Sequence, residues 1–432
     1  MSALYRNDKP GQHAPSWYAA SVPERPLRPK LTADARADVV ILGAGFTGLW
    51  AAKILAEAGL RVVVLEAHRV GFGASGRNGG QVIPGYNWDM SALHARLGDK
   101  AAHDLWDLSQ SGLAQLKEVC ARHPDTAFRT GWAQAEPHVS DFAAYPAEAA
   151  FLATTFDHHV EILGTKAFRD LVKTEDYVGG WYDRSGGHLH PLAYTHALAT
   201  EAEAAGAVIH ERSEVLEIRP GAPVQLRCLR GTVTADHAIL AGNGYLPGLM
   251  PPVNRRVMPM NSFIAVTEPL PDLWLDVLAE DIAISDERFV VNYFRFTADR
   301  RFLFGGLESY GLGFPRQIEQ PLKAKIARMF PQLAAARIDH AWGGTLAITP
   351  TRLPHVARVG QNVISAAGFS GLGVSLSGVA GRVMAEAVLG QAKGLTTLDA
   401  LPVPSFPGGT AFRAPILALA MSWFALRDRL GV

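Results

Sequence analysis

The stretch that most constrains the fold lies between residues 38 and 66. The run "DVVIL" (38–42) is apolar enough for a buried parallel strand, and the turn "GAGFTG" (43–48) follows it directly. Residues 47–58 have helical spacing, and "RVVVL" (61–65) reads as a second buried strand. Because two such strands joined through a helix form a βαβ unit, the sequence predicts an α/β fold built on a Rossmann-like domain.

Three glycines of the turn, Gly43, Gly45 and Gly48, have the spacing of a dinucleotide fingerprint. The first permits the tight turn, the second lets the backbone approach a pyrophosphate, and the third lets helix and strand pack closely. Phe46 and Thr47 open the helix, whose N-terminus presents free N–H groups to the phosphates. This context predicts a dinucleotide-binding site.

Glu66 and the adjoining Ala67 end the second strand, where an adenosine ribose binds in such folds. The carboxylate can accept hydrogen bonds from the ribose and would repel a 2′-phosphate, so FAD and NAD remain open and NADP is disfavoured. The chain has no second fingerprint, and its two cysteines, Cys120 and Cys228, lie far apart. These absences argue against a flavin–nicotinamide reductase and a disulfide reductase.

The loop "GFGASGRNGGQV" (71–82) favours FAD over NAD. A flavin is long and planar, so its ribityl chain and ring need backbone N–H groups well beyond the first phosphate turn. We expect Ser75 and Arg77 to serve pyrophosphate or ribityl oxygens, and Gly79 and Gly80 to let the backbone approach the ring. The polar residues Asn78 and Gln81 complete this expected cofactor loop.

Residues 258–306 alternate apolar and polar side chains, which is typical of a half-exposed antiparallel sheet. We therefore expect a Rossmann-like FAD-binding domain that is interrupted by a substrate domain with a largely antiparallel sheet. Helices are expected near 91–122 and 143–172. The predicted divisions are an N-terminal arm at 1–35, a discontinuous FAD-binding domain at 36–85, 186–250 and 340–400, a substrate domain at 86–185 and 251–339, and a helical tail at 401–432.

Composition narrows the class of protein further. Lys plus Arg equals Asp plus Glu at 41 each in 432 residues, so no overall charge favours nucleic acid as a partner. No apolar run reaches the ~18 residues of a membrane-spanning helix, and residues 1–31 form a proline-rich extended arm unlike a signal peptide. We expect a cytoplasmic protein without a metal site. The apolar segment 415–426 is expected to pack as a terminal helix, with membrane contact as the less favoured reading.

Several longer motifs carry a family resemblance. They are "SWYAAS" (16–21), "EAHRVGFGASGRNGGQVIPGY" (66–86), "FRFTADRRFLFGG" (294–306), "GFSGLGVSLSG" (368–378) and "FPGGTAFRAPILALAM" (406–421). With them the chain resembles the D-amino acid oxidase superfamily of FAD-dependent amine oxidoreductases. Within that group it is most similar to the γ-glutamylputrescine oxidases.

The resemblance implies further FAD contacts. Val215 would pair its backbone with adenine, and Ala241 and Gly242 would lie beside the cofactor. A helix N-terminus at the flavin's pyrimidine end would be formed by Gly371, Leu372, Gly373 and Val374. Relatives with covalent flavin carry a cysteine before a Thr-Pro motif, and "WGGTLAITPTRLP" (342–354) has none, so the FAD is expected to be non-covalent.

The reaction that the resemblance implies is oxidation of a small amine or amino acid. A hydride would pass from the carbon next to nitrogen to flavin N5, and oxygen would be reduced to hydrogen peroxide. Sarcosine oxidases of this superfamily speed oxygen reduction with a lysine, whereas "RRFLFGG" offers only Arg300 and Arg301, so slower turnover is expected. The alternatives are a quinone-reducing dehydrogenase, an oxidase of secondary or cyclic amino acids such as sarcosine or pipecolate, and a non-catalytic dinucleotide-binding protein.

Candidates for the substrate site come from two segments. Tyr293 and Arg295 alternate with phenylalanines and are expected to share one strand face, where the guanidinium would suit a substrate carboxylate. His190, with His188, is expected to face the flavin cavity. Trp342 is interpreted as a packing residue.

Overall fold

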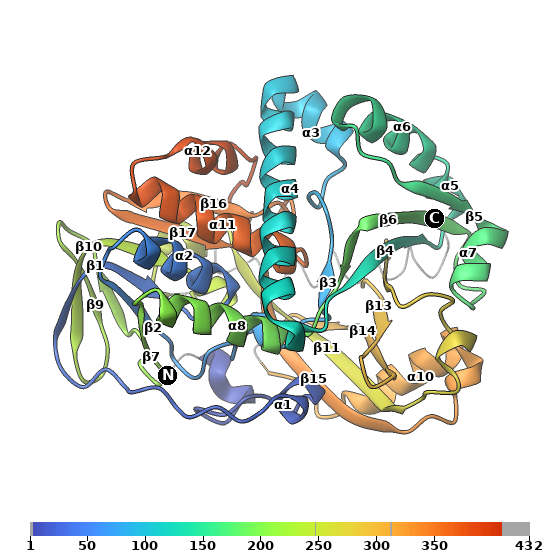
Figure 1. Cartoon of the computed structure of the whole chain (residues 1–432), viewed down its shortest axis with the longest axis horizontal. Coiled ribbons are helices and arrows are strands. Elements are labelled where there is room, and N and C mark those ends of the chain that lie inside the picture. Colours follow the sequence, from blue (N-terminus) through green and yellow to red (C-terminus); the bar gives the residue numbers. More distant parts are fainter. Residues whose placement is uncertain (1–2, 247, 312, 408–432) are drawn as a thin grey trace.

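The computed structural model of the chain describes residues 3–246, 248–311 and 313–407, and two sheets organise it (Figure 1). The first sheet has the order β16-β17-β10-β1-β2-β7, with β9 paired to β10 and β8 to β9. Neighbouring strands from β17 to β7 run parallel. Its strands are β1 Ala35–Leu42, β2 Val62–Leu65, β7 Val208–His210, β8 Glu217–Arg219, β9 Val224–Arg227, β10 Thr232–Leu240, β16 His355–Gly360 and β17 Val363–Ala367.

The central strands of this sheet are buried on both faces. Val39, Val40 and Ile41 of β1 are fully buried, because helices cover one face and a second apolar cluster under β8–β10 covers the other. Parallel strands enclosed in this way require nearly continuous apolar runs. The βαβ unit predicted from residues 38–66 is confirmed.

The second sheet has the order β15-β11-β14-β13-β12-β4-β6-β3, with β5 paired to β6. It is antiparallel except where β12 pairs with β4, which confirms the predicted fold class. Its strands are β3 Gln81–Val82, β4 Arg129–Glu136, β5 Glu161–Gly164, β6 Gly179–His188, β11 Met258–Pro269, β12 Ala283–Asp286, β13 Tyr293–Phe296, β14 Arg301–Ser309 and β15 Ile338–Ile348.

The helices cover the sheets and fill the space between them. In Figure 1, α2, α8 and α11 lie on the first sheet and the long α4 stands between the two halves. Within residues 3–246, 248–311 and 313–407, no helix is long and apolar enough to cross a membrane. The α-helices are α1 Trp17–Ser21, α2 Phe46–Glu57, α3 Met90–Leu97, α4 Asp99–Arg122, α5 Val139–Phe142, α6 Tyr145–Phe156, α7 Thr165–Leu171, α8 Pro191–Ala204, α9 Pro251–Asn254, α10 Glu319–Met329, α11 Gly373–Val388 and α12 Lys393–Asp399.

Three expectations need correction. Residues 340–348, expected in the FAD-binding domain, belong to β15 of the second sheet, because β15 pairs with β11 over nearly its whole length. The helix expected over 143–172 is interrupted by β5, which pairs with β6. The arm at 1–35 is not simply extended, since it contains the 3-10 helix η1 (Ala3–Asn7) and α1. The terminal segment 415–426 lies outside the described residues.

Candidate active site

A cavity of about 1230 Å³ opens between the two sheets. One end is bordered by Leu42 and Leu65, at the carboxyl ends of β1 and β2, and the other by Trp132 and Gln134 of β4. Ligands of open α/β sheets bind outside the carboxyl ends of the strands. Because small-molecule sites usually span about 300–1,000 Å³, this cavity has room for an extended cofactor and a substrate.

The fingerprint glycines have distinct steric roles at the first end. Gly43 has a φ of +100°, and its own side-chain position is blocked by the carbonyl of Ala241 at 2.8 Å. A Cβ on Gly45 would lie 2.6 Å from Ser75 Oγ, and one on Gly48 would lie 2.0 Å from Gly43 O. The N-terminus of α2 follows without a side-chain cap. Apart from the Phe46 N–H, which donates to Ser75 Oγ, the N–H groups of its first turn therefore remain available to an anionic ligand.

Glu66 is tied to the same turn. Its two carboxylate oxygens accept hydrogen bonds from the backbone N–H groups of Ala44 and His68, each at 2.9 Å. Burial raises the pKa of Glu66 to about 7 despite these bonds. A ribose hydroxyl donating to this carboxylate would offset the desolvation, as the predicted adenosine contact requires.

The loop 71–82 carries the chain from the first sheet to the second, where it ends as β3. Ser75 Oγ accepts from the Phe46 N–H at 3.0 Å, which leaves the hydroxyl hydrogen free to donate to a ligand. Arg77 is buried and donates to Phe72 O and Gly343 O, while its Nη2 has no hydrogen-bond partner within the described residues. An unsatisfied buried guanidinium nitrogen beside the cavity fits an anionic or carbonyl oxygen of a ligand.

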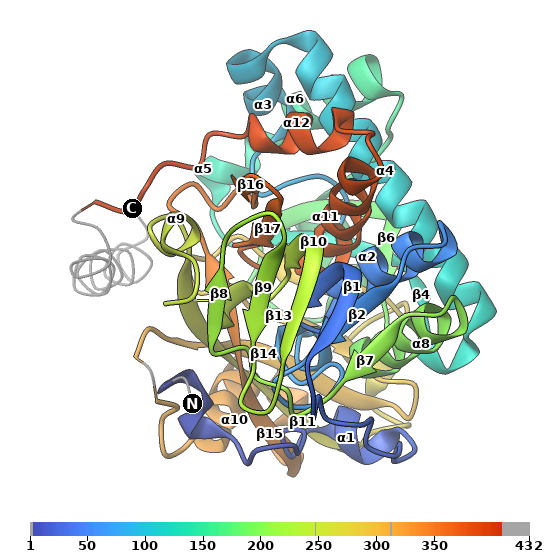
Figure 2. The same cartoon turned by 90° about the vertical axis from the view of Figure 1, so that its left-hand side faces the viewer.

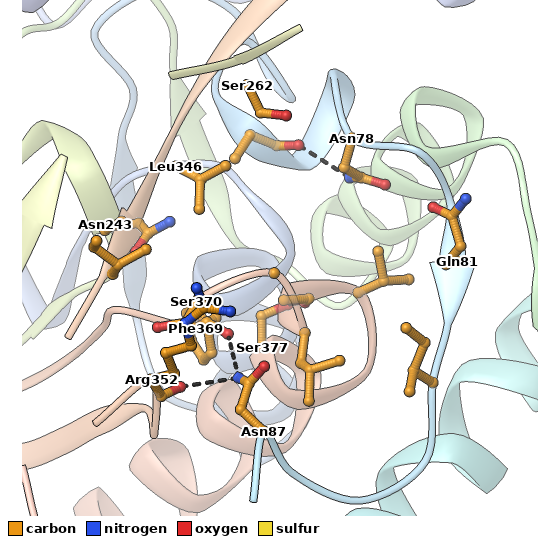
Figure 3. A pocket seen from close by; sticks show the side chains of 18 of the residues that line it. Asn78, Gln81, Asn87, Asn243, Ser262, Leu346, Arg352, Phe369, Ser370 and Ser377 are labelled. Carbon is orange, nitrogen blue, oxygen red and sulfur yellow. Dashed lines mark hydrogen bonds between the residues drawn. The ribbon is translucent and has the colours of Figure 1, made fainter. Parts of the chain in front are cut away.

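A second helix N-terminus opens on the cavity. Gly371 has a φ of +104°, and α11 begins at Gly373 without a side-chain cap. Figure 3 shows how the surrounding loops are joined, because the Asn87 amide donates to Arg352 O at 2.9 Å and to Phe369 O at 3.3 Å. The two uncapped helices leave two sets of N–H donors at the walls of one cavity.

Most of the predicted cofactor residues border this cavity. Gly48 and Gly80 do not, and both are needed for backbone packing: Gly80 has a φ of +84°, and its Cβ position lies 2.2 Å from Leu189 O. The predicted residues that border the cavity are Gly43, Gly45, Phe46, Thr47, Glu66, Ala67, Ser75, Arg77, Asn78, Gly79, Gln81, Val215, Ala241, Gly242, Gly371, Leu372, Gly373 and Val374.

Two of the three residues predicted to act on the substrate do not border the cavity. Arg295 is 3% exposed and donates to Gly79 O, Leu189 O, Phe296 O and the Tyr18 hydroxyl. His190 caps α8 through Nδ1, and its Nε2 lies 3.0 Å from Ser21 Oγ. Neither side chain therefore reaches the cavity in the described structure. β13 is covered on both faces, so the alternation from which the role of Arg295 was predicted does not separate solvent from core.

Tyr293, the third, does border the cavity. Its ring lies 2.7 Å from the Cβ position of Gly79, and its hydroxyl lies 3.1 Å from Ser262 Oγ. Burial raises the pKa of the phenol, so it is protonated at neutral pH. Trp342 is buried and donates to Arg77 O, as a packing residue would.

The far end of the cavity contains polar groups that the sequence did not reveal. They include Gln134 and Glu136 of β4, Glu287 and Arg352, from three separate segments. The parallel pairing of β12 with β4 brings residues 283–286 beside 132–135. Neither segment carries a motif, so only the strand order of the second sheet could have brought them together.

The family follows from comparison with known proteins. Residues 38–387 match the model of the family described as "FAD dependent oxidoreductase". This chain belongs to that family of FAD-dependent oxidoreductases. Its members bind FAD, which is accordingly the cofactor, and the glycine turn, Glu66, the unpaired Arg77 Nη2 and the two uncapped helices form a site of the right chemistry to hold it.

Several individual relatives are also similar. The chain is 38% identical to the probable oxidoreductase OrdL of Rhizobium meliloti, over 96% of this chain and 97% of that protein. It is 35% identical to the γ-glutamylputrescine oxidoreductase of Escherichia coli, over 98% of this chain and all of that protein. Among solved structures, glycine oxidase from Geobacillus kaustophilus gives a TM-score of 0.70 at 22% identity, covering 83% of this chain and 95% of that one. That last likeness shows a shared fold.

Proposed function

We propose that this enzyme oxidises a cationic amine of the γ-glutamylputrescine type. The observation that carries the proposal is the charge of the cavity's far end, where carboxylates outnumber guanidinium groups. The acidic residues that border that end are Asp89, Glu136, Asp141, Glu148, Asp183, Asp286, Glu287 and Glu308, against Arg352 within the described lining. Such a surface favours a substrate that carries positive charge.

Some of these carboxylates already have partners within the protein. Glu148 accepts from the Met90 N–H at the start of α3, Asp183 lies 2.8 Å from His158 Nε2, and Asp286 pairs with Arg288. Within the described residues, Glu136 and Glu287 accept only from neutral donors. These are the His138 N–H and the Tyr145 hydroxyl for Glu136, and the Gln134 amide for Glu287. Neither forms an ion pair within the described residues, in contrast to Asp183 and Asp286.

Glu136 is the last residue of β4 and Glu287 directly follows β12. The two lie together because these strands pair in parallel. Burial, and then the charges of Glu136, Asp89 and Asp286, raise the pKa of Glu287 to about 7. The pKa values of Asp89 and Glu136 are raised as well. Carboxylates that disfavour one another's ionisation are stabilised by a cation placed among them.

Two aromatic rings and one guanidinium group form the rest of the cavity wall at its far end. The rings of Tyr145 and Trp181 border the cavity with centroids 5.3 Å apart, and aromatic faces attract ammonium groups. Arg352 lies over the Phe289 ring at 5.1 Å and takes the role first assigned to Arg295, that of binding a substrate carboxylate. An amino acid head with an amine tail matches both charges.

FAD held in this site would supply a hydride acceptor for the carbon next to the substrate nitrogen, and water would hydrolyse the resulting imine to an aldehyde or keto product. The chain contributes mainly by orientation, which is a large part of catalysis when reacting atoms are held in place. Glu136 and Glu287 bind the ammonium end, while Tyr293 and Gly79 shape the wall from β13 and the cofactor loop. Oxygen would accept the two electrons and form hydrogen peroxide.

The affinity of a permanently charged ligand depends on pH only through the ionisation of the protein, because the ligand itself does not titrate. Butyltrimethylammonium keeps its charge at every pH, so its affinity should rise between pH 6 and 8 as Glu287 loses its proton. The dissociation constant should fall by up to about tenfold, in proportion to the ionised fraction. Isothermal titration over this pH range measures the change.

Glu287→Gln should weaken that ligand at pH 8 and flatten the pH dependence, because the amide cannot ionise. It should also raise KM for the amine while the flavin spectrum is unchanged. Glu319→Gln, at the start of α10 on the surface, is the matched control. If Glu287→Gln binds the cation as well as wild type does, the assignment of this end fails.

Oxygen turnover should be slower than in relatives that place a lysine at the flavin. Arg300 pairs with Asp281 and lies over the Trp274 ring, and Arg301 pairs with Asp299 and Asp339. Neither arginine borders the cavity, and its described lining contains no lysine. Stopped-flow reoxidation with oxygen, beside a soluble quinone, measures the rate. Fast quinone reduction with negligible oxygen reactivity would make the enzyme a dehydrogenase.

A further inference from the structure

The N-terminal arm passes directly over the cofactor loop. Figure 2 shows the first residues running along the lower edge of the molecule, from η1 to α1. Residues 5–18, which we term the strap, contact the loop 71–82 and the preceding His68 at several separate points. The Rossmann-like sheet begins only at Ala35, so nothing in its topology requires these contacts.

The first contact is made by aromatic rings. Tyr5 stacks on Tyr245, with centroids 5.4 Å apart and planes at 12°, and meets His68 edge-on at 4.5 Å. Tyr5 itself borders the cavity, as do Glu66 and Val215, which are the residues expected at the adenosine. The Tyr5 ring is therefore part of the wall that encloses this end of the cofactor site.

The second contact is an ion pair. Asp8 Oδ1 lies 2.7 Å from Arg77 Nη1, and the two side chains are only 7% and 3% exposed. Removing one partner of such a buried ion pair strongly destabilises the structure around it, because the other charge is left buried and uncompensated. Since Arg77 Nε also donates to Phe72 O at 2.6 Å, Asp8 fixes a side chain that spans the cofactor loop.

Two more hydrogen bonds extend the contact along the loop. The Gly11 N–H donates to His68 Nδ1 at 3.1 Å, and the Tyr18 hydroxyl donates to Asn78 O at 2.8 Å. The Tyr18 oxygen also accepts from Arg295 Nη2 at 3.2 Å. The strap thus holds the loop at both ends, near the adenosine and near the flavin.

We propose that the strap is a positioning element of the FAD site: residues 5–18 hold the loop 71–82 against the cofactor and close its adenosine end. FAD leaves only after the strap has opened. The inference depends on FAD binding and is independent of which amine is oxidised.

The release rate of FAD tests this directly. FAD regains fluorescence when it leaves the holoenzyme, so the fluorescence rise after dilution of loaded protein far below its dissociation constant reports the rate. Tyr5→Ala should release FAD about tenfold faster or more, because several ring contacts are lost. Tyr5→Phe, which keeps the ring, should release it at the wild-type rate, as should Leu27→Ala outside the strap.

Asp8→Asn distinguishes two roles of Asp8: holding the strap on the cofactor loop through Arg77, or acting on FAD only through its negative charge. If Asp8 acted only through its charge, its removal would leave Arg77 unpaired near the cofactor phosphates and would slow release. If Asp8 instead holds the strap on the loop, its removal speeds release, and this is the result we expect. Glu24→Gln, an exposed carboxylate beyond the strap, is the matched control.

Hydrogen exchange gives a readout that does not depend on the variants. FAD added to wild-type apoprotein should slow amide exchange in residues 5–18, because the strap closes on the cofactor. Unchanged exchange there, or a wild-type release rate in both Tyr5→Ala and Asp8→Asn, would overturn the proposal.

Discussion

Glu66→Arg is expected to purify without colour, with FAD affinity weakened by roughly a hundredfold or more. The substitution removes the carboxylate that accepts from the Ala44 and His68 N–H groups and places a larger cation in a buried position. Hydrogen bonds to a charged group contribute about 1.5–3 kcal/mol each. Equilibrium titration of the apoprotein with FAD, followed by fluorescence quenching, gives the affinity.

Glu66→Gln keeps one acceptor and should bind FAD with intermediate affinity. Glu57→Arg, at the far end of α2, controls for the added charge. Thermal unfolding of each apoprotein separates loss of the site from loss of the fold. A yellow Glu66→Arg variant, or a colourless wild type that binds NADH tightly, would contradict the assignment of Glu66 to the FAD ribose.

Arg295→Ala is expected to destabilise the whole protein rather than alter substrate binding. The guanidinium donates to carbonyl oxygens of Gly79, Leu189 and Phe296, and alanine would leave these buried acceptors unpaired beside a new void. Unpaired buried acceptors cost about 1–3 kcal/mol each, so we expect a loss of about 3–5 kcal/mol, which lowers Tm by about 3–6 °C for a chain of this length. Differential scanning fluorimetry of the apoprotein measures the shift.

Arg337→Ala, at an exposed surface pair, should leave Tm unchanged and is the control. Arg295→Lys should recover little stability, because a lysine cannot donate in several fixed directions at once. A wild-type Tm with a raised KM in Arg295→Ala would return this arginine to the substrate site.

The fold could be predicted where local chemistry determines it. Residues 39–42 and 62–65 are apolar throughout because both faces of the first sheet are buried there. The glycines of 43–48 meet steric limits that come mostly from nearby backbone. Residues 340–348 could not be assigned correctly, because their place in the second sheet depends on pairing with β11, far away in the sequence.

The substrate end could not be predicted for the same reason. Alternation along 293–296 describes the two faces of β13, but both faces are covered. The prediction that Arg295 faces a substrate site therefore had no open surface to support it. Glu136 and Glu287 carry no motif and meet only through the parallel pairing of β12 with β4. The contacts of the strap could not be predicted either, because the sequence of a proline-rich arm does not indicate that Asp8 forms a buried ion pair with Arg77.

Anaerobic reduction of the bound flavin tests the central claim most directly. The purified holoenzyme is mixed without oxygen with γ-glutamylputrescine, and in parallel with sarcosine and pipecolate, while the visible flavin absorbance is followed. We expect rapid bleaching by the cationic amine and slow or no bleaching by the two amino acids. In Glu287→Gln, the cationic amine at concentrations below saturation should bleach the flavin more slowly than in the wild type. Rapid bleaching by sarcosine or pipecolate with none by the cationic amine would contradict the central claim.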